Sequence, residues 1–441
     1  MSIIILIPSV VCVLALCFWP PARVFRDIVL PVLLLLPIYY YWKVALLPPI
    51  DFADAVLFPL GVALFIRAMS RWRFSVMDLW VVLFIVSSCL SDRLQGASTA
   101  SVFEFFDSIC KVLVPYMAGK LLIEQDDARA ITLKRIVMLI FTASIIATYE
   151  RFASKNPFQL IFGRFFEGND IPWNVQLRNG VARITGPYAQ AELAGMMLLF
   201  AILLALYLSH YYNWGTRFHF APSLPVRKSA LVVGMLLLAL VLTQSRGPEL
   251  GLLFAIPIAF IGRSRRVLRA TLLVAALLVV GGAVAYEAVI HYANTSAPTS
   301  EEQETAAYRA VMIEDYLPMA EHSGAWGMGP HFPRIGKYVS VDNEYLFVAL
   351  TQGYIGLGSF LLLIGGTLFN LVTAAIYNPD RLDRSFAFTL LGVLFGILVT
   401  IATVYLGNQP LIFFFLLTGW AQAVRVHPVR RQLPVFQQVY T

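Results

Sequence analysis

Residues 230–262 have the sequence ALVVGMLLLALVLTQSRGPELGLLFAIPIAFIG, in which two apolar runs flank the short polar segment 243–248. Long apolar runs separated by a short polar segment predict two membrane helices joined by a turn. Glycine and proline alone would suffice for such a turn. Arg246, which follows the amide of Gln244 and the hydroxyl of Ser245, instead indicates a group that holds an anion at the bilayer boundary.

Composition extends this prediction to the whole chain. The 441 residues are 59% hydrophobic and only 13% charged, with a mean hydropathy of +0.73, whereas soluble domains are about 45–50% apolar and about 25% charged. We therefore expect an all-α, polytopic membrane protein with a single integral membrane domain, residues 1–441, since no polar stretch is long enough to bury a core of its own. The net charge of +7 reflects basic loops rather than a nucleic-acid partner.

The four cysteines, Cys12, Cys17, Cys89 and Cys110, lie in or beside apolar segments, and none has CxxC spacing. We expect them to be small buried apolar residues rather than disulfides or metal ligands. The first residues lack the basic segment of a secretory signal, so a retained first helix is expected.

Hydropathy predicts about thirteen spans, or twelve if an early pair is one helix. They cover residues 2–18, 28–42, 52–69, 76–91, 101–123, 131–150, 187–212, 228–244, 248–262, 267–286, 343–374, 385–405 and 410–424.

Basic residues gather in alternate loops, which predicts their orientation because cytoplasmic loops carry an excess of Lys and Arg. These residues are Arg67, Arg71, Arg73, Lys134, Arg135, Arg263, Arg265, Arg266, Arg269, Arg381, Arg384, Arg425, Arg430 and Arg431. All these loops can be cytoplasmic at once. The two longest polar loops, 151–186 and 287–342, and the turn at Arg246 then share the extracytoplasmic face.

The 287–342 loop contains a predicted amphipathic helix over residues 305–319, with Tyr308, Val311, Met312 and Tyr316 at helical spacing. Gly324, Gly327 and Gly329 follow it, around Trp326. Closely spaced glycines permit a tight turn that lets backbone approach a partner.

Three arginines are candidate diphosphate-binding residues: Arg183, which precedes a long apolar run, Arg246, and Arg309 in the loop helix. A guanidinium offers a planar fork of donors that fits phosphate oxygens. The structural alternative is an arginine that snorkels to head groups or caps carbonyls. Gly247 supports the functional interpretation of Arg246, because it removes side-chain bulk beside the guanidinium.

Candidate general bases lie in and after the same loop. Asp342 or Glu344 is one possibility, although Asp342 or Asn343 could simply cap the helix that starts there, a common role at this position. His322 and His331 are the others, since either could take a proton near neutral pH. A fourth group, Glu104, Asp107 and Lys111, falls on one helix face, which predicts either internal pairing or a proton relay.

The chain lacks GxxxxGK[ST], HExxH, GxSxG and Cys/His metal spacing. We therefore expect no cofactor, no metal and no nucleophilic serine.

The ordered motifs between about residues 180 and 360 resemble the O-antigen ligase and O-antigen polymerase superfamily of bacterial polytopic membrane glycosyltransferases. The motifs are Arg183-Ile184-Thr185-Gly186-Pro187-Tyr188, then Thr243-Gln244-Ser245-Arg246-Gly247, then Arg309 with His322 to Gly329, then Asp342-Asn343-Glu344-Tyr345-Leu346, and finally Gly353-Tyr354-Ile355-Gly356. One departure from the family's pattern is informative. Ligases typically place a histidine before the asparagine of the fourth motif, where this chain has Asp342, which favours the polymerase branch.

The resemblance implies metal-independent transfer of a glycan from a polyprenyl diphosphate, such as undecaprenyl diphosphate, at the periplasmic face of the bacterial inner membrane. The acceptor would be a sugar hydroxyl, on a growing glycan for a polymerase or on lipid A–core for a ligase. Membrane lipid and a chain-length regulator are further candidate partners. The implied roles are diphosphate binding for Arg183, Arg246 and Arg309 and proton removal for Asp342, His322 or His331.

Two other classes compete with this interpretation. A secondary transporter predicts a repeat between halves and ionisable residues in broken helices near mid-membrane. A scaffold of an envelope complex would not need Arg246.

Overall fold

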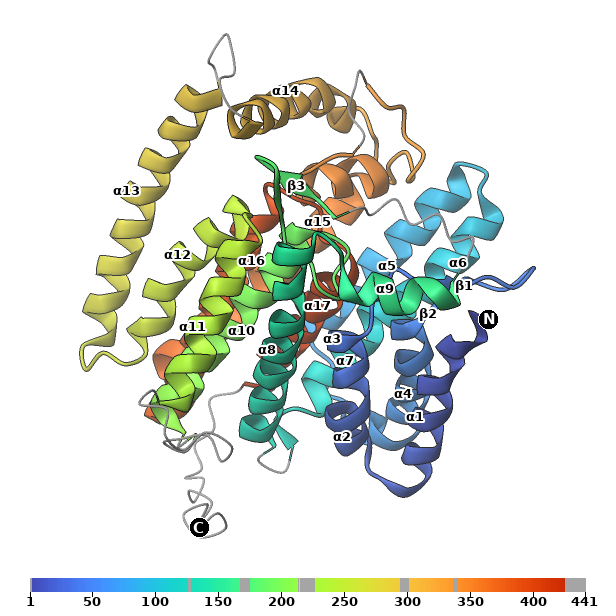
Figure 1. Cartoon of the computed structure of the whole chain (residues 1–441), viewed down its shortest axis with the longest axis horizontal. Coiled ribbons are helices and arrows are strands. Elements are labelled where there is room, and N and C mark those ends of the chain that lie inside the picture. The colour runs from blue at the N-terminus through green and yellow to red at the C-terminus, as the bar shows by residue number, and fades with distance from the viewer. Residues whose placement is uncertain are drawn as a thin grey trace.

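The computed structural model describes residues 2–125, 128–166, 175–212, 214, 227–293, 301–335 and 340–424, and the account below concerns these residues. Helices make up nearly all of the regular structure, and most of them run side by side in a bundle (Figure 1). This confirms the prediction of an all-α polytopic membrane protein. The basic tail residues Arg425, Arg430 and Arg431, and parts of the loops 151–186 and 287–342, lie outside the described residues.

The longer helices are α1 (Leu6–Phe18), α4 (Phe52–Ala68), α5 (Val76–Leu94), α6 (Ser98–Ser108), α8 (Arg129–Ala153), α10 (Ala191–Tyr211), α11 (Lys228–Leu242), α12 (Arg246–Ile261), α13 (Val267–Ala293), α14 (Glu301–Glu321), α15 (Glu344–Tyr377), α16 (Arg381–Ile401) and α17 (Asn408–Ala423). Shorter turns of helix are η1 (Ser2–Ile5), α2 (Pro21–Val24), η2 (Phe25–Val29), α3 (Leu30–Leu35), η3 (Met69–Arg71), η4 (Ile109–Leu113), α7 (Val114–Leu121), α9 (Pro157–Phe162) and η6 (Gly163–Phe165). The strands form two antiparallel pairs, β1 (Tyr41–Trp42) with β2 (Ile50–Asp51), and β3 (Leu177–Arg178) with β4 (Val181–Ala182).

Within the described residues, six helices are long and apolar enough to cross a membrane: Phe52–Arg71, Arg129–Ala153, Ala191–Tyr211, Val267–Val284, Glu344–Tyr377 and Arg381–Ile401. Ile3–Phe18 and Lys228–Leu242 are shorter apolar helices. The predicted span 28–42 is wrong at its far end, since α3 stops at Leu35. Pro37 follows Leu36, and a residue before proline is pushed from helical into extended backbone, which Leu36 adopts.

Glycines allow the central helices to approach backbone to backbone. A Cβ built on Gly251 of α12 would lie 2.5 Å from the carbonyl oxygen of Gly396 on α16. A Cβ on Gly119 of α7 would lie 2.1 Å from the carbonyl oxygen of Leu416 on α17. Small residues drive such close packing in membranes, where the lipid is as apolar as the side chains. These contacts hold α12 against α16 and α7 against α17.

Helix α14 lies across one end of the bundle, above the β3–β4 hairpin (Figure 1). Met312 and Tyr316 are buried in a small apolar cluster with Val341 and Leu346, which confirms an amphipathic helix in this loop. Val311, predicted on the same face, is 48% exposed. It precedes Met312 by one residue and so points about 100° away from it around the helix.

We call the end of the bundle covered by α14 the site face. The turn between α12 and α13 and the last residues of α1 and α4 lie at the opposite end (Figure 1). We call this opposite end the arginine-rich face, after Arg67, Arg71, Arg263, Arg265 and Arg266.

The cysteines are free thiols with different surroundings. Cys12 and Cys110 are buried and Cys89 is partly buried, whereas Cys17 is exposed. The prediction of burial is therefore wrong for Cys17, because the end of α1 lies on the perimeter of the bundle.

Helix α15 is broken at Gly353, whose backbone (φ 66°, ψ −162°) is not helical. The glycine segment after α14 pairs with the groups that the break exposes. Four backbone hydrogen bonds join the two segments, from Met328 N to Leu350 O (2.8 Å), Gly329 N to Thr351 O (3.0 Å), Tyr354 N to Gly324 O (3.1 Å) and Ile355 N to Ala325 O (3.0 Å). The glycine run therefore docks on α15, which ties the end of α14 to the bundle.

We expect Gly353→Ala to destabilise the protein, because this backbone region is almost exclusive to glycine and a Cβ would lie 2.3 Å from the amide nitrogen of Gly327. The cost should be about 1–3 kcal/mol, seen as a lower Tm in detergent. Gly358→Ala is the matched control, since nothing lies within 4 Å of its Cβ position on the same helix. An equal Tm for the two variants would contradict this account of the break.

Candidate functional site

The turn between α11 and α12 is polar but buried. Thr243 is 0% exposed and Ser245 is 2% exposed, and Gln244 between them has a left-handed backbone with φ 50°. Such a turn leaves carbonyls and hydroxyls inside the protein, and buried polar groups are costly unless they are hydrogen-bonded.

Arg183 supplies the missing partners. Its Nε donates to the carbonyl of Thr243 (2.8 Å), and its Nη2 lies 2.7 Å from both Ser245 Oγ and Glu192 Oε1. Its Nη1 donates to Gln176 Oε1 (3.2 Å). Arg183 is 6% exposed. Most of its donors are thus used within the protein, and the guanidinium joins the β3–β4 hairpin, α10 and the α11–α12 turn.

The segment after Arg183 is held in place by the buried carboxylate of Glu150. Glu150, at the end of α8, accepts hydrogen bonds from Thr185 N (2.8 Å), Thr185 Oγ1 (3.0 Å) and Gly186 N (2.7 Å). Asn156 donates to Thr185 Oγ1 and to the carbonyl of Gly186, each at 2.9 Å. Gly186 has φ +63°, a conformation that side chains disfavour. The motif after Arg183 is therefore a rigid turn, which holds the arginine in place.

Arg246 differs from Arg183 because it is exposed, at the first position of α12. Arg178 on β3 lies nearby, with its Nη1 donating to the carbonyl of Gln244 (2.6 Å). Both arginines interact electrostatically with Glu249 in the first turn of α12. The rim of the turn therefore presents two cations outside the buried Arg183.

Gly247 has a steric role beside Arg246. A Cβ on this residue would lie 2.6 Å from Thr403 Oγ1 in the connection between α16 and α17. Gly247 thus lets the start of α12 lie against that connection.

Helix α14 brings a further cation to the site. Arg309 interacts electrostatically with Glu192 and with Asp342. Its Nε is buried and has no hydrogen-bond partner in the part of the chain that the structure describes. Glu192 therefore interacts with two arginines, with Arg183 beside the α11–α12 turn and with Arg309 in α14.

Asp342 lies just before α15 and is partly buried. Its Oδ1 accepts a hydrogen bond from Ser340 Oγ (2.6 Å). Burial raises the pKa of Asp342 above its ordinary value, although Ser340 and the charge of Arg309 oppose that rise. A half-buried carboxylate beside a cation can accept a proton from a bound hydroxyl.

The residues after Asp342 anchor α15. Asn343 caps the helix, with its Oδ1 accepting from Leu346 N (3.1 Å) and its Nδ2 donating to the carbonyl of Ala402 (3.0 Å). Glu344 is buried and accepts from Leu406 N (2.7 Å), while Tyr345 donates to the carbonyl of Leu398 (3.2 Å). The cap is therefore Asn343, which leaves the carboxylate of Asp342 available.

The two histidines lie elsewhere. His322 follows α14, roughly 20 Å along the helix from Arg309 at 1.5 Å per residue, and its Nδ1 lies 2.7 Å from the carbonyl of Pro318. His331 interacts electrostatically with Asp92 at the end of α5. The structure therefore groups Asp342, but not His322, with Arg309.

Sequence reasoning missed Glu150, Glu192 and Arg178. The two glutamates do carry a signal, because ionisable residues within or at the ends of membrane helices are rare and usually paired. Arg178 lies five residues before Arg183 in a polar stretch, and nothing in its local sequence distinguishes it.

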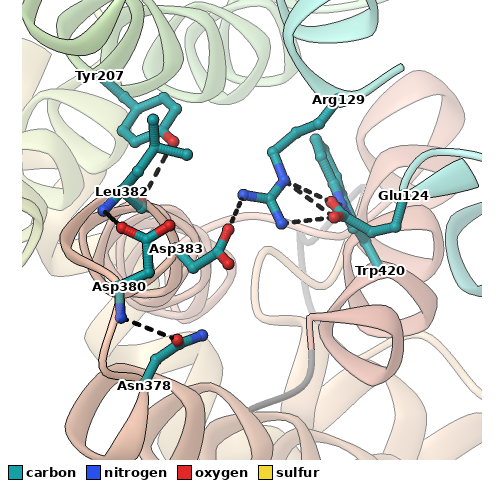
Figure 2. Close-up of polar contacts among 8 residues, drawn as sticks. All are labelled: Glu124, Arg129, Tyr207, Asn378, Asp380, Leu382, Asp383 and Trp420. Carbon is teal, nitrogen blue, oxygen red and sulfur yellow. Dashed lines mark hydrogen bonds and ion pairs between the residues drawn. The ribbon is translucent and has the colours of Figure 1, made fainter. Parts of the chain in front are cut away.

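Other polar clusters are internally paired. At the arginine-rich face, Arg129 lies between Glu124 and Asp383, and Trp420 Nε1 donates to Glu124 (2.7 Å), as Figure 2 shows. This cluster links α8, α16 and α17.

A second cluster lies in the N-terminal part of the chain. Lys111 pairs there with Asp107 and with Asp51 (2.8 Å), and Glu104 accepts a hydrogen bond from Ser88 Oγ (2.7 Å). No group of three or more His, Cys, Asp or Glu in the described ranges could hold a metal ion.

Comparison with protein families gives a match of residues 230–361 to the family described as O-Antigen ligase. No curated protein matches the chain. The matched residues run from α11 into α15 and include Arg246, Arg309 and Asp342, while Arg183 and Glu192 lie before them.

We expect Arg183→Lys to lower the Tm and Arg246→Lys to leave it unchanged. An ammonium cannot reach the carbonyl of Thr243, Ser245 Oγ and Glu192 together, and an unsatisfied buried polar group costs about 1–3 kcal/mol. Arg246 is exposed and tolerates lysine. Thermal unfolding of both variants in detergent checks this, and equal Tm values would contradict a structural role for Arg183.

Proposed function

We propose, from the similarity of residues 230–361 to the O-antigen ligase family, that the chain belongs to the O-antigen ligase and polymerase superfamily and is a membrane glycosyltransferase. It moves a glycan from a polyprenyl-diphosphate lipid, such as undecaprenyl diphosphate, to a sugar hydroxyl. The reaction takes place at the site face, on the periplasmic side of the bacterial inner membrane. A polymerase that joins repeat units of an O-antigen or exopolysaccharide is favoured over a ligase that modifies lipid A–core, because Asp342 replaces the family's histidine.

One observation carries the proposal. The buried Arg183 fixes the turn that presents Arg246, and α14 adds Arg309 beside Asp342 at the same face. Cations and a partly buried carboxylate thus meet where the lipid's diphosphate reaches the membrane surface.

The chemistry follows from these groups. Asp342 takes the proton of the acceptor hydroxyl, and the resulting oxygen nucleophile attacks the anomeric carbon of the donor sugar. The bond from that carbon to the diphosphate oxygen breaks, and the lipid diphosphate leaves with the bonding electrons. Arg246 and Arg309 stabilise its developing negative charge, the role that a divalent cation has in many phosphoryl sites. The proposed transfer is therefore metal-independent.

Arg183 has a positioning role in this scheme. With its donors on Thr243, Ser245 and Glu192, it keeps the turn in place. Arg178, half-exposed on β3, is the further candidate for contact with the diphosphate.

We expect Arg246→Lys to reduce transfer roughly 100-fold or more, as loss of one preorganised donor does in comparable sites. Lysine keeps the charge but lacks the planar fork for phosphate oxygens. The measurement is the size ladder of surface polysaccharide in a deletion strain complemented with each variant. Arg266→Lys, on the arginine-rich face, is the matched control and should restore the full ladder.

The same ladder separates the two branches of the family. Single repeat units that remain attached to acceptor indicate a polymerase, whereas loss of all attached glycan with accumulation of lipid-linked polymer indicates a ligase. A full ladder from both Arg246→Lys and Asp342→Asn would refute the glycosyltransferase proposal.

Transfer by the purified protein should fall as pH drops through the raised pKa of Asp342, because a base must be deprotonated to act. The acid limb of the pH profile should therefore lie above the ordinary aspartate value of 3.8. Asp342→His should move this limb toward about 6.5, the ordinary pKa of histidine. An acid limb that does not move in Asp342→His would exclude Asp342 as the base.

A further inference from the structure

A hollow of about 320 Å³ opens at the arginine-rich face, far from the site face. It is lined by the ends of three helices: the end of α1 with the start of α2, the end of α4 with η3, and the turn after α7. Its lining residues are Cys17, Phe18, Trp19, Pro20, Pro21, Arg67, Ala68, Arg71, Leu122 and Gln125.

Two arginines give the hollow its charge. Arg67 is fixed in place, because its Nη1 donates to the carbonyl of Leu16 at the end of α1 (2.6 Å), and the rest of its guanidinium remains exposed. Arg71 is exposed on η3. No acidic residue is among the described residues that line the hollow.

The carboxylate that the structure describes on the α7–α8 connection, that of Glu124, is already paired. Glu124 accepts from Arg129 and from Trp420 Nε1 in the buried cluster of Figure 2. It is therefore unavailable to Arg67 or Arg71. The positive charge of the described lining residues therefore favours binding of an anion from outside the protein.

The rest of the lining is apolar and faces outward. Phe18 is 83% exposed and Trp19 is 36% exposed, and the guanidinium of Arg23 lies 4.3 Å from the Trp19 ring centroid. Tryptophan and arginine together are typical of the membrane–water boundary, where lipid phosphates lie. Beyond this rim, α1 and α4 expose apolar side chains that include Val10, Leu14, Val62, Phe65 and Ile66.

We propose that this hollow binds one anionic phospholipid, with its phosphodiester on Arg67 and Arg71 and its acyl chains along α1 and α4. Arginine pairs with phosphate through two parallel donors, and basic pockets between membrane helices on the positively charged side select anionic head groups. A zwitterionic head group fits less well, because its own ammonium offsets the phosphate charge. This site is independent of the proposed transfer reaction.

The test uses the full-length protein in nanodiscs with equal amounts of phosphatidylglycerol and phosphatidylethanolamine. Native mass spectrometry after lipid stripping counts the lipids that remain bound. The wild type should retain phosphatidylglycerol in preference to phosphatidylethanolamine. Each arginine near the surface contributes about a five-fold change in affinity, so Arg67→Gln with Arg71→Gln should weaken retention roughly 25-fold.

The matched control is Arg265→Gln with Arg266→Gln, which removes the same charge from an exposed loop on the same face. It should retain phosphatidylglycerol like the wild type. Because Arg67 also supports the end of α1, Arg71→Gln alone is measured as well and should weaken retention about five-fold.

Three outcomes would overturn the proposal. The double variant could retain as much phosphatidylglycerol as the control pair, or the wild type could retain phosphatidylethanolamine equally well. In a third arm, inorganic phosphate is added to the delipidated protein in detergent. If inorganic phosphate binds there and phosphatidylglycerol does not, the hollow is a site for free phosphate rather than for a lipid.

Discussion

The guanidinium of Arg183 holds the site face together. It hydrogen-bonds a buried backbone carbonyl at Thr243, a buried hydroxyl at Ser245 and the carboxylate of Glu192. Without these partners the α11–α12 turn would place unsatisfied polar groups inside a protein whose surroundings are lipid, where they are most costly. The exposed position of Arg246 depends on this interaction, because the turn that bears it has its conformation set from inside.

A second constraint places the covering helix. The break at Gly353 opens backbone groups within α15, and the glycine run after α14 satisfies them. A break in a membrane helix is tolerated only where other protein groups replace the missing hydrogen bonds. The glycine run after α14 and the break at Gly353 therefore depend on each other, because their backbone groups pair. Through it, α14 is held across the bundle with Arg309 toward Glu192 and Asp342.

The arginines at the two ends of the bundle differ in how completely they are paired. At the arginine-rich face, Arg129 is enclosed by Glu124 and Asp383 and lies 4.5 Å from the Phe386 ring centroid, so it joins helices and offers little to a ligand. At the site face, Arg246 is exposed, and the Nε of Arg309 has no hydrogen-bond partner among the described residues. A buried charge needs complete pairing, whereas a charge that binds an anion must keep part of its donor capacity for it. This difference favours the site face as the place of the proposed reaction.

The sequence by itself determined the class of fold and the motifs of the candidate site. Long apolar runs predict membrane helices, and Arg246, Gly247 and Asp342 stand in local motifs that resemble those of the O-antigen ligase family. Only the tertiary structure distinguished the buried Arg183 from the exposed Arg246, chose Asn343 over Asp342 as the cap, and separated His322 from Arg309. Each of these depends on partners distant in sequence, such as Glu192 for Arg183 and Ala402 for Asn343. Hydrogen bonds between segments far apart in sequence leave no periodic pattern in it, and so they become visible only when the chain is folded.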